Sequence, residues 1–142
     1  MTEVREAAGA AEVEAALALR ERVFCGEQGV TLAADQDGLD QEATHIVAVD
    51  DGRLVGTCRL VFENDLARLG RMAVEPSDRG RGLGAEVLAE AERASRAEGA
   101  QRIRLHAQEA AVTLYERAGF QAVGEAFLEE GIRHVTMEKR LA

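Results

Sequence analysis

Glycine and arginine alternate in one short segment, which runs from Arg79 to Gly84. It follows an apolar run that ends at Pro76, and it precedes residues with helical spacing. Glycine lets backbone N–H groups approach a ligand without a Cβ in the way, and the first N–H groups of a helix attract anions. The segment therefore predicts an anion site at a strand-to-helix turn, and a pyrophosphate group fits such a site best.

Two familiar phosphate-binding motifs do not match this segment. A P-loop needs a Lys followed by Ser or Thr after its last glycine, and no Lys follows here. The dinucleotide fingerprint needs GxGxxG in a parallel β-α-β unit, whereas Gly80, Gly82 and Gly84 alternate and follow antiparallel hairpins. A tight turn that binds no ligand remains the alternative.

The elements that must position the turn follow from the spacing of apolar residues. Asp51-Gly52 between two β-branched runs is a strong hairpin signal, and Gly99 stands where a helix would end. The sequence predicts a first helix that reaches about residue 24, then a loop with a short helix over 26–41. It further predicts strands over 45–49, 53–62, 67–75, 103–107, 120–127 and 132–139, and helices over 83–95 and 110–117. This order indicates an α/β fold, a mixed sheet with helices on its faces, in a single domain over residues 1–142.

Composition limits the class of partner. The 142 residues carry 17 Lys and Arg against 26 Asp and Glu, so the formal net charge is −9. An acidic surface repels phosphate backbones and anionic lipids, which argues against nucleic-acid or membrane binding. We see no export signal and no spanning segment, and Cys25 and Cys58 form no CxxC pair. These features predict a cytoplasmic protein with reduced thiols and without a metal site.

Longer motifs carry a resemblance to a known family. Arg79-x-x-Gly82-x-Gly84 after a Met-Ala-Val strand resembles the pyrophosphate-binding motif of the GNAT superfamily of acetyl-CoA-dependent N-acetyltransferases. Residues 105–120 are similar to the later strand and helix of that family, with its Tyr-x-x-x-Gly-Phe signature. Val-Phe-x-x-Glu-Gln-Gly at 23–29 and Gly-Ile-x-His-x-x-Met at 131–137 resemble a small bacterial subgroup. The resemblance covers nearly the whole chain.

The resemblance implies a GNAT-like acyl-CoA N-acyltransferase fold, with a central, mostly antiparallel sheet flanked by helices. It also implies acetyl-CoA as co-substrate, a small-molecule or peptide amine as acceptor, direct attack in a ternary complex, and a homodimer. Gln108 stands where the family commonly has Asn on the coenzyme arm. The coenzyme-binding positions implied are Met72, Ala73, Val74, Arg79, Gly80, Arg81, Gly82, Leu83, Gly84 and Gln108.

Two residues are implied for catalysis. Tyr115, the only tyrosine, matches the family tyrosine that protonates the departing thiolate. Its alternative is a partly buried aromatic with a local hydrogen bond. His134 is the leading candidate for the base that takes the amine proton, because an imidazole titrates near neutral pH. A structural strand histidine is an equal alternative for His134, and His106 is more readily a structural histidine than a catalytic one.

Acidic residues suggest where an amine would bind. Glu27, Asp37 and Asp40 lie in the loop that borders the acceptor pocket in this fold, and Glu75 follows the coenzyme-binding strand. With His106 they form the expected substrate side, although a solvated acidic loop is the commoner explanation of such a run. The competing function is a non-catalytic acyl-CoA-binding or sensing module, which keeps the coenzyme site and lacks a productive acceptor pocket.

Overall fold

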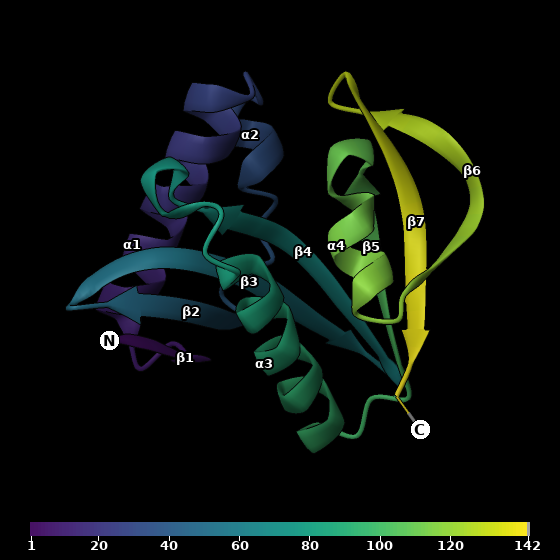
Figure 1. Ribbon diagram of the computed structural model, residues 1–142, viewed down its shortest axis with the longest axis horizontal. Coiled ribbons are helices and arrows are strands. Elements are labelled where there is room, and N and C mark those ends of the chain that lie inside the picture. The colour runs from purple at the N-terminus through teal and green to yellow at the C-terminus, as the bar shows by residue number, and fades with distance from the viewer. Residues whose placement is uncertain (142) are drawn as a thin grey trace.

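Seven strands form one sheet in the order β1-β2-β3-β4-β5-β7-β6, as the computed structural model shows for residues 1–141 (Figure 1). All neighbours are antiparallel except β4 and β5. The strands are β1 (Thr2–Glu6), β2 (Thr44–Asp50), β3 (Arg53–Glu63), β4 (Leu66–Val74), β5 (Arg102–Gln108), β6 (Gln121–Glu129) and β7 (Ile132–Arg140). The predicted mixed α/β fold with a mostly antiparallel sheet is confirmed.

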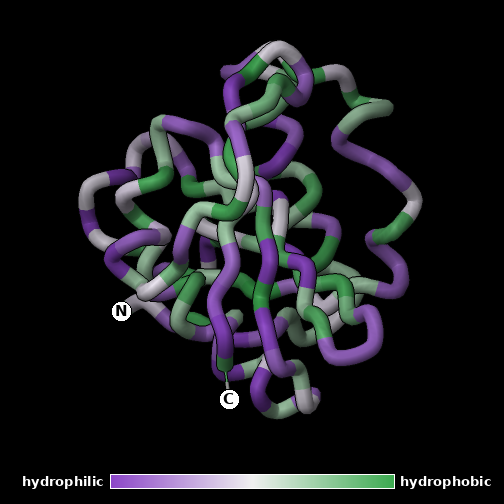
Figure 2. The backbone as a smooth tube through the Cα atoms, turned by 90° about the vertical axis from the view of Figure 1, so that its right-hand side faces the viewer, coloured by the Kyte–Doolittle hydropathy of each residue, from purple (hydrophilic) through white to green (hydrophobic). Residues whose placement is uncertain are grey.

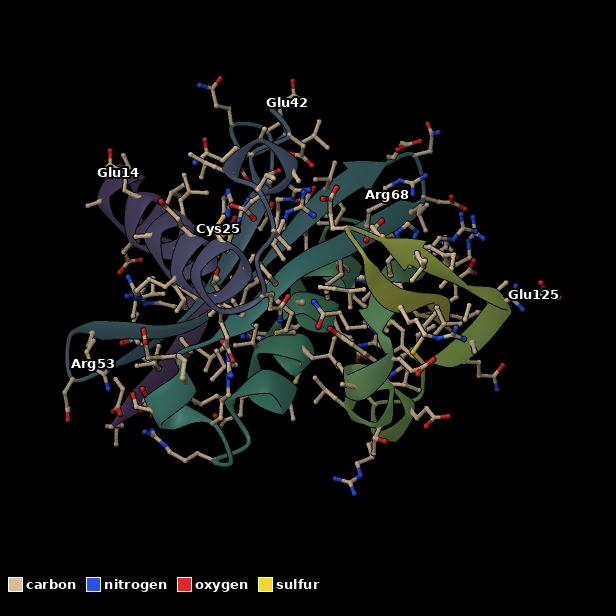
Figure 3. The ribbon with its side chains drawn as sticks, turned by 90° about the horizontal axis from the view of Figure 1, so that it is seen from above. Glu14, Cys25, Glu42, Arg53, Arg68 and Glu125 are labelled. Carbon is tan, nitrogen blue, oxygen red and sulfur yellow. The ribbon has the colours of Figure 1, made fainter. Side chains whose placement is uncertain are left out.

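The helices lie on both faces of this sheet (Figure 3). They are α1 (Ala10–Arg20), the π-helical segment η1 (Glu21–Glu27), α2 (Leu32–Asp35), α3 (Leu83–Ala97) and α4 (Val112–Arg117), with short 3-10 turns η2 (Pro76–Asp78) and η3 (Glu109–Ala111). On the α1 side, Leu19 and Val23 pack on Ala73 of β4. On the other side, Val87 and Leu88 of α3 belong to the main core. Burying each of these side chains contributes about 1.5–3 kcal/mol, so the apolar face of α3 fixes it against the sheet.

Local sequence explains the hairpins. Asp51 and Gly52 both have positive φ, 50° and 81°, which is the geometry of a tight two-residue turn between twisted strands. This confirms the hairpin predicted from that pair. In Figure 2, which looks at the side of β6 and β7, hydrophilic and hydrophobic segments alternate along these strands.

The N-terminal segment differs from the prediction. Residues 2–6 form β1, an edge strand paired with β2 from Thr2↔Asp50 to Glu6↔Ile46. The sequence did not predict a strand here, because a five-residue edge strand with charged side chains lacks the alternation of a half-buried strand. The missed strand leaves the predicted coenzyme turn in place.

The sheet opens between β4 and β5. Parallel pairing runs only from Leu66↔Arg102 to Leu69↔Leu105. Beyond that point β4 stays on β3 through an irregular register, and Arg71 there has a φ of 56°. Strand β5 continues along β7 as far as Gln108↔His134. Strands β4 and β5 therefore diverge toward the top of Figure 1. The β5-facing edge of β4 after Leu69 therefore has no strand partner among residues 1–141.

None of the helices within residues 1–141 is long and apolar enough to cross a membrane.

Candidate functional site

The glycine turn lies between β4 and α3, as predicted. Gly80 and Gly82 have φ values of 85° and 79°, a region that residues with a Cβ rarely adopt. A Cβ on Gly84 would stand 3.4 Å from Leu114 Cδ2, so glycine lets α3 and α4 approach closely. Because α3 begins at Leu83, its first N–H groups have no partner within the helix. The turn therefore presents backbone donors at the positive end of a fifteen-residue helix.

A cavity of about 630 Å³ adjoins these donors. Its walls come from the turn and from α4. Residues of both elements line it: Val74, Arg79, Gly80, Gly82, Leu83, Gly84, Ala85, Thr113, Leu114, Arg117 and Ala118. Of the predicted coenzyme-binding residues, six therefore lie around one cavity. We refer to it as the turn cavity.

The two arginines of the turn already have carboxylate partners. Arg79 donates to both oxygens of Glu27 at 2.7 and 2.8 Å and to the Val74 carbonyl at 3.2 Å. Arg81 donates to Asp78 at 2.7 Å and to Asp50 at 3.2 Å. The hydrogen bonds from Arg79 lower the pKa of Glu27. Glu27 therefore stays ionised, and its charge is directed at the turn.

A second cavity, of about 440 Å³, opens at the gap between β4 and β5. It reaches Met72 on β4 and His106 on β5, and Leu114 lines both this cavity and the turn cavity. Its charged and titratable lining residues are Asp35, Arg59, Arg68, Arg71, Arg104, His106, Tyr115, Glu129 and Glu130. The two cavities therefore lie on either side of one α4 residue, Leu114. We refer to the second one as the gap cavity.

Tyr115 lines the gap cavity and is only 5% exposed. Its ring meets Phe120 edge-on, with 5.9 Å between the centroids. Burial, with a smaller effect from Cys58, raises the pKa of the Tyr115 phenol. The hydroxyl therefore keeps its proton at neutral pH and can donate it.

Gln108 faces the same cavity but already has a partner. Its side-chain amide donates to Gln28 Oε1 at 2.9 Å, and the Gln28 amide returns a longer contact of 3.4 Å. Gln28 follows η1 directly, so the pair ties β5 to the segment after the first helix. The coenzyme contact predicted for Gln108 requires this pair to open or to share a donor.

The acidic residues of the predicted substrate side are paired with arginine. Asp37 accepts from Arg59 at 2.8 Å on each oxygen, and these hydrogen bonds lower its pKa to about 2. Burial opposes ionisation of Asp40, but hydrogen bonds from Arg20 at 2.7 Å and from Arg59 outweigh it and lower its pKa. Neither residue lines the gap cavity. In this structure these carboxylates neutralise buried arginines.

Two further predicted site residues, Glu75 and His134, do not line the gap cavity. Glu75 accepts from Arg22 at 2.8 Å, beside β4 and outside the gap cavity. His134 is 7% exposed, and its Nδ1 lies 2.7 Å from the Ile132 carbonyl. It does not line the gap cavity, whereas His106 does.

Two residues that line the gap cavity, Glu129 and Asp35, are not among the site residues predicted from the sequence. Glu129, at the end of β6, lies 3.0 Å from His106 Nδ1 through Oε1. Asp35 is 2% exposed, pairs with Arg20 at 3.2 Å, and leaves Oδ2 without a hydrogen bond among the described residues. Neither carries a local sequence signal, since each becomes distinctive only through contacts with distant segments. Within residues 1–141, no group of three His, Cys, Asp or Glu side chains could hold a metal ion.

Known proteins are similar to this chain in sequence and in fold. A family model described as an acetyltransferase (GNAT) domain matches residues 7–141. An uncharacterised N-acetyltransferase of Bacillus subtilis, YjcF, is 34% identical over 129 residues, which span 90% of this chain and 92% of that protein. An acyl-CoA N-acyltransferase from Pseudomonas aeruginosa superposes with a TM-score of 0.85 at 30% identity, over 98% of this chain and 99% of that one.

A more distant structure shares the fold alone. It is N-acetylglutamate synthase from Neisseria gonorrhoeae, complexed with coenzyme A and N-acetyl-glutamate, with a TM-score of 0.78 at 22% identity. The match covers 100% of this chain and 35% of that one. The family match and the sequence identity to YjcF extend over the turn, the gap and α4. The chain therefore belongs to the GNAT family of acetyltransferases.

Proposed function

We propose that this acetyltransferase moves an acetyl group from acetyl-CoA to a primary amine by direct attack in a ternary complex. The observation that carries the proposal is that the turn cavity and the gap cavity share Leu114 as a lining residue. One cavity offers anion-binding amides, and the other offers titratable side chains. A coenzyme and an amine could therefore reach the same point from opposite faces of the sheet.

The coenzyme would bind along α3 and β4. The amides of Gly80, Gly82 and Leu83 would hold the pyrophosphate at the helix N-terminus. The unpaired edge of β4 at Met72–Val74 would hold the pantetheine arm and polarise the thioester carbonyl. N-acetylglutamate synthase, which shares the fold, is complexed with coenzyme A, and this supports coenzyme A as the ligand.

Transfer then needs one bond formed and one broken. The amine nitrogen attacks the thioester carbon, the C–S bond breaks, and the electron pair leaves with sulfur. Tyr115 would donate its proton to that sulfur, since the buried phenol is protonated at neutral pH. A thiol has a pKa of about 8.5, so the leaving group needs only modest help.

The competing proposal is an acyl-CoA sensor without an acceptor. The titratable lining of the gap cavity favours the enzyme, because a sensor has no use for His106 or Tyr115 beside an open cavity. We also propose a homodimer, from the resemblance alone, and a cytoplasmic location, from the cysteines and the lack of an export signal in the sequence.

An acetyl-CoA consumption assay tests the proposal. Amines, amino sugars, polyamines and peptide N-termini are added in turn, and thiol release is followed. We expect at least one class to stimulate release well above hydrolysis. Coenzyme binding measured by calorimetry, with no stimulation by any class, would favour the sensor instead.

A further inference from the structure

Two strands of the β5-β7-β6 part of the sheet bring a histidine and a carboxylate together at the wall of the gap cavity. We propose that His106 is the base that takes the proton of the acceptor amine, and that Glu129 positions its ring. This inference rests on the proposed function, since it names the base for the same reaction. It differs from the sequence prediction, which gave that role to His134.

The hydrogen bond between the two residues sets which nitrogen can act. His106 Nδ1 lies 3.0 Å from Glu129 Oε1. An ionised carboxylate only accepts, so Nδ1 carries the hydrogen and Nε2 holds the lone pair. His106 is 45% exposed and lines the cavity, and Nε2 has no hydrogen-bond partner among residues 1–141. A side chain that lines the cavity therefore has a nitrogen lone pair free to accept a proton.

Aromatic packing holds the ring in this orientation. Phe127 on β6 meets the His106 ring edge-on, with 5.0 Å between centroids. Phe127 also stacks with His134, with 6.0 Å between the centroids and 23° between the planes. Phe127 and His134 are partners in the β6–β7 register, so the strands themselves fix this stack.

His134 lies beside Glu129 and outside the lining of the gap cavity. Its Nδ1 lies 2.7 Å from the Ile132 carbonyl, which can only accept, so Nδ1 donates there. Its Nε2 lies 3.6 Å from Glu129 Oε2, the oxygen that His106 leaves free. Because His134 is only 7% exposed and lies outside the cavity lining, an amine in the cavity reaches His106 more readily than His134.

The proton balance closes with these groups. The amine proton passes to His106 Nε2 as the N–C bond forms, and Tyr115 supplies a proton to the departing sulfur. Solvent then removes the proton from His106 and restores the one on Tyr115. The charged groups that also line the cavity and influence these steps are Asp35, Arg59, Arg68, Arg71, Arg104 and Glu130.

The test compares His106→Asn, Glu129→Gln and His134→Asn with the wild type, using the amine found by the consumption assay. Glu125→Gln is the matched control, because Glu125 is on the same strand as Glu129 and points outward at the edge of the molecule (Figure 3). We expect His106→Asn to lower kcat/KM for the amine by about 10²-fold with unchanged acetyl-CoA affinity. It should also abolish the acid limb of the pH profile.

The other variants should behave differently. Glu129→Gln should lower kcat by roughly tenfold and displace the acid limb, because the tautomer of His106 is no longer fixed. Glu125→Gln should match the wild type. Added imidazole should partly restore activity to His106→Ala, which separates a lost base from a misfolded chain.

Three outcomes would overturn the inference. One is a normal acid limb with near-normal kcat/KM in His106→Asn. Another is a loss confined to His134→Asn, which would return the role to His134. The third is a wild type that binds acetyl-CoA and acetylates no amine, which removes the proposed function as well. The first two leave the proposed function standing, so the two failures are distinguishable.

Discussion

Tyr115 shows how burial prepares a single side chain for one role. It is 5% exposed, yet it lines the cavity where the acyl group would be transferred. Burial raises its pKa, so the phenol stays protonated at neutral pH. The contact with Phe120 holds the Tyr115 ring, so the ring is already ordered before a ligand binds.

Replacing Tyr115 by Phe removes the hydroxyl and keeps the ring. We expect turnover to fall by about 10²-fold, the range for one acid, while acetyl-CoA affinity stays unchanged. Steady-state kinetics and calorimetry measure the two separately. Normal turnover in this variant would exclude Tyr115 as the acid.

The pair of Asp37 and Arg59 predicts how stability depends on pH. The pKa of Asp37 is lowered from 3.8 to about 2 by hydrogen bonds from Arg59, so the folded state binds this proton less readily than the unfolded state. The contribution is therefore complete above about pH 4 and is lost as pH falls toward 2. Asp37 is 30% exposed, and we expect roughly 1–2 kcal/mol.

Urea unfolding of wild type and Asp37→Asn at pH 7 and pH 2.5 checks this contribution. The difference between the two proteins should shrink at the lower pH. Glu42→Gln, at an exposed position in the same loop, serves as control (Figure 3). An equal difference at both pH values would contradict the assignment.

At the scale of elements, the ion pair of Arg79 and Glu27 joins η1 to the coenzyme turn. The pair lies at the surface, 42% and 43% exposed, so it adds little to the stability of the fold. Pyrophosphate and Glu27 would compete for the same guanidinium. Coenzyme binding would then release η1, whose next residue, Gln28, contacts the gap cavity.

Glu27→Gln tests this competition. We expect acetyl-CoA to bind a few-fold more tightly at low salt, because Arg79 no longer has an anionic partner. Arg79→Ala should weaken binding, and Glu14→Gln on the exposed side of α1 should leave it unchanged (Figure 3). Calorimetry reports all three. Unchanged affinity in both Glu27→Gln and Arg79→Ala would mean that the backbone amides alone bind the coenzyme.

The elements also show what a sequence can and cannot predict. Hairpins marked by Asp51-Gly52 and the helix after Gly82 carry local signals, so their positions were predictable. The pairing of Gln28 with Gln108 joins residues eighty positions apart, and no local pattern encodes it. The same holds for Glu129 beside His106, because only the β5-β7-β6 order brings them together.

At the scale of the whole molecule, the net charge of −9 hides a structured distribution. Carboxylates of the first loops pair with Arg20, Arg59 and Arg79, and so contribute to the fold. Both signs of charge line the gap cavity, in arginines from β3, β4 and β5 and in acids at the β6–β7 turn. Net charge alone therefore does not describe the charges that line the gap cavity, where the amine is proposed to bind.

The short parallel ladder between β4 and β5 has a consequence for motion. Four register pairs, from Leu66↔Arg102 to Leu69↔Leu105, are the only strand pairing within residues 1–141 between the first four strands and the last three. We expect amide hydrogens of Arg102–Leu105 to exchange with deuterium faster than those in the long β3–β4 ladder, because the two groups of strands open as separate cooperative units. Acetyl-CoA spanning the gap should slow that exchange, and mass spectrometry of peptides from β5 with and without the coenzyme would measure it. Equal exchange in both ladders would mean that the sheet opens as one unit.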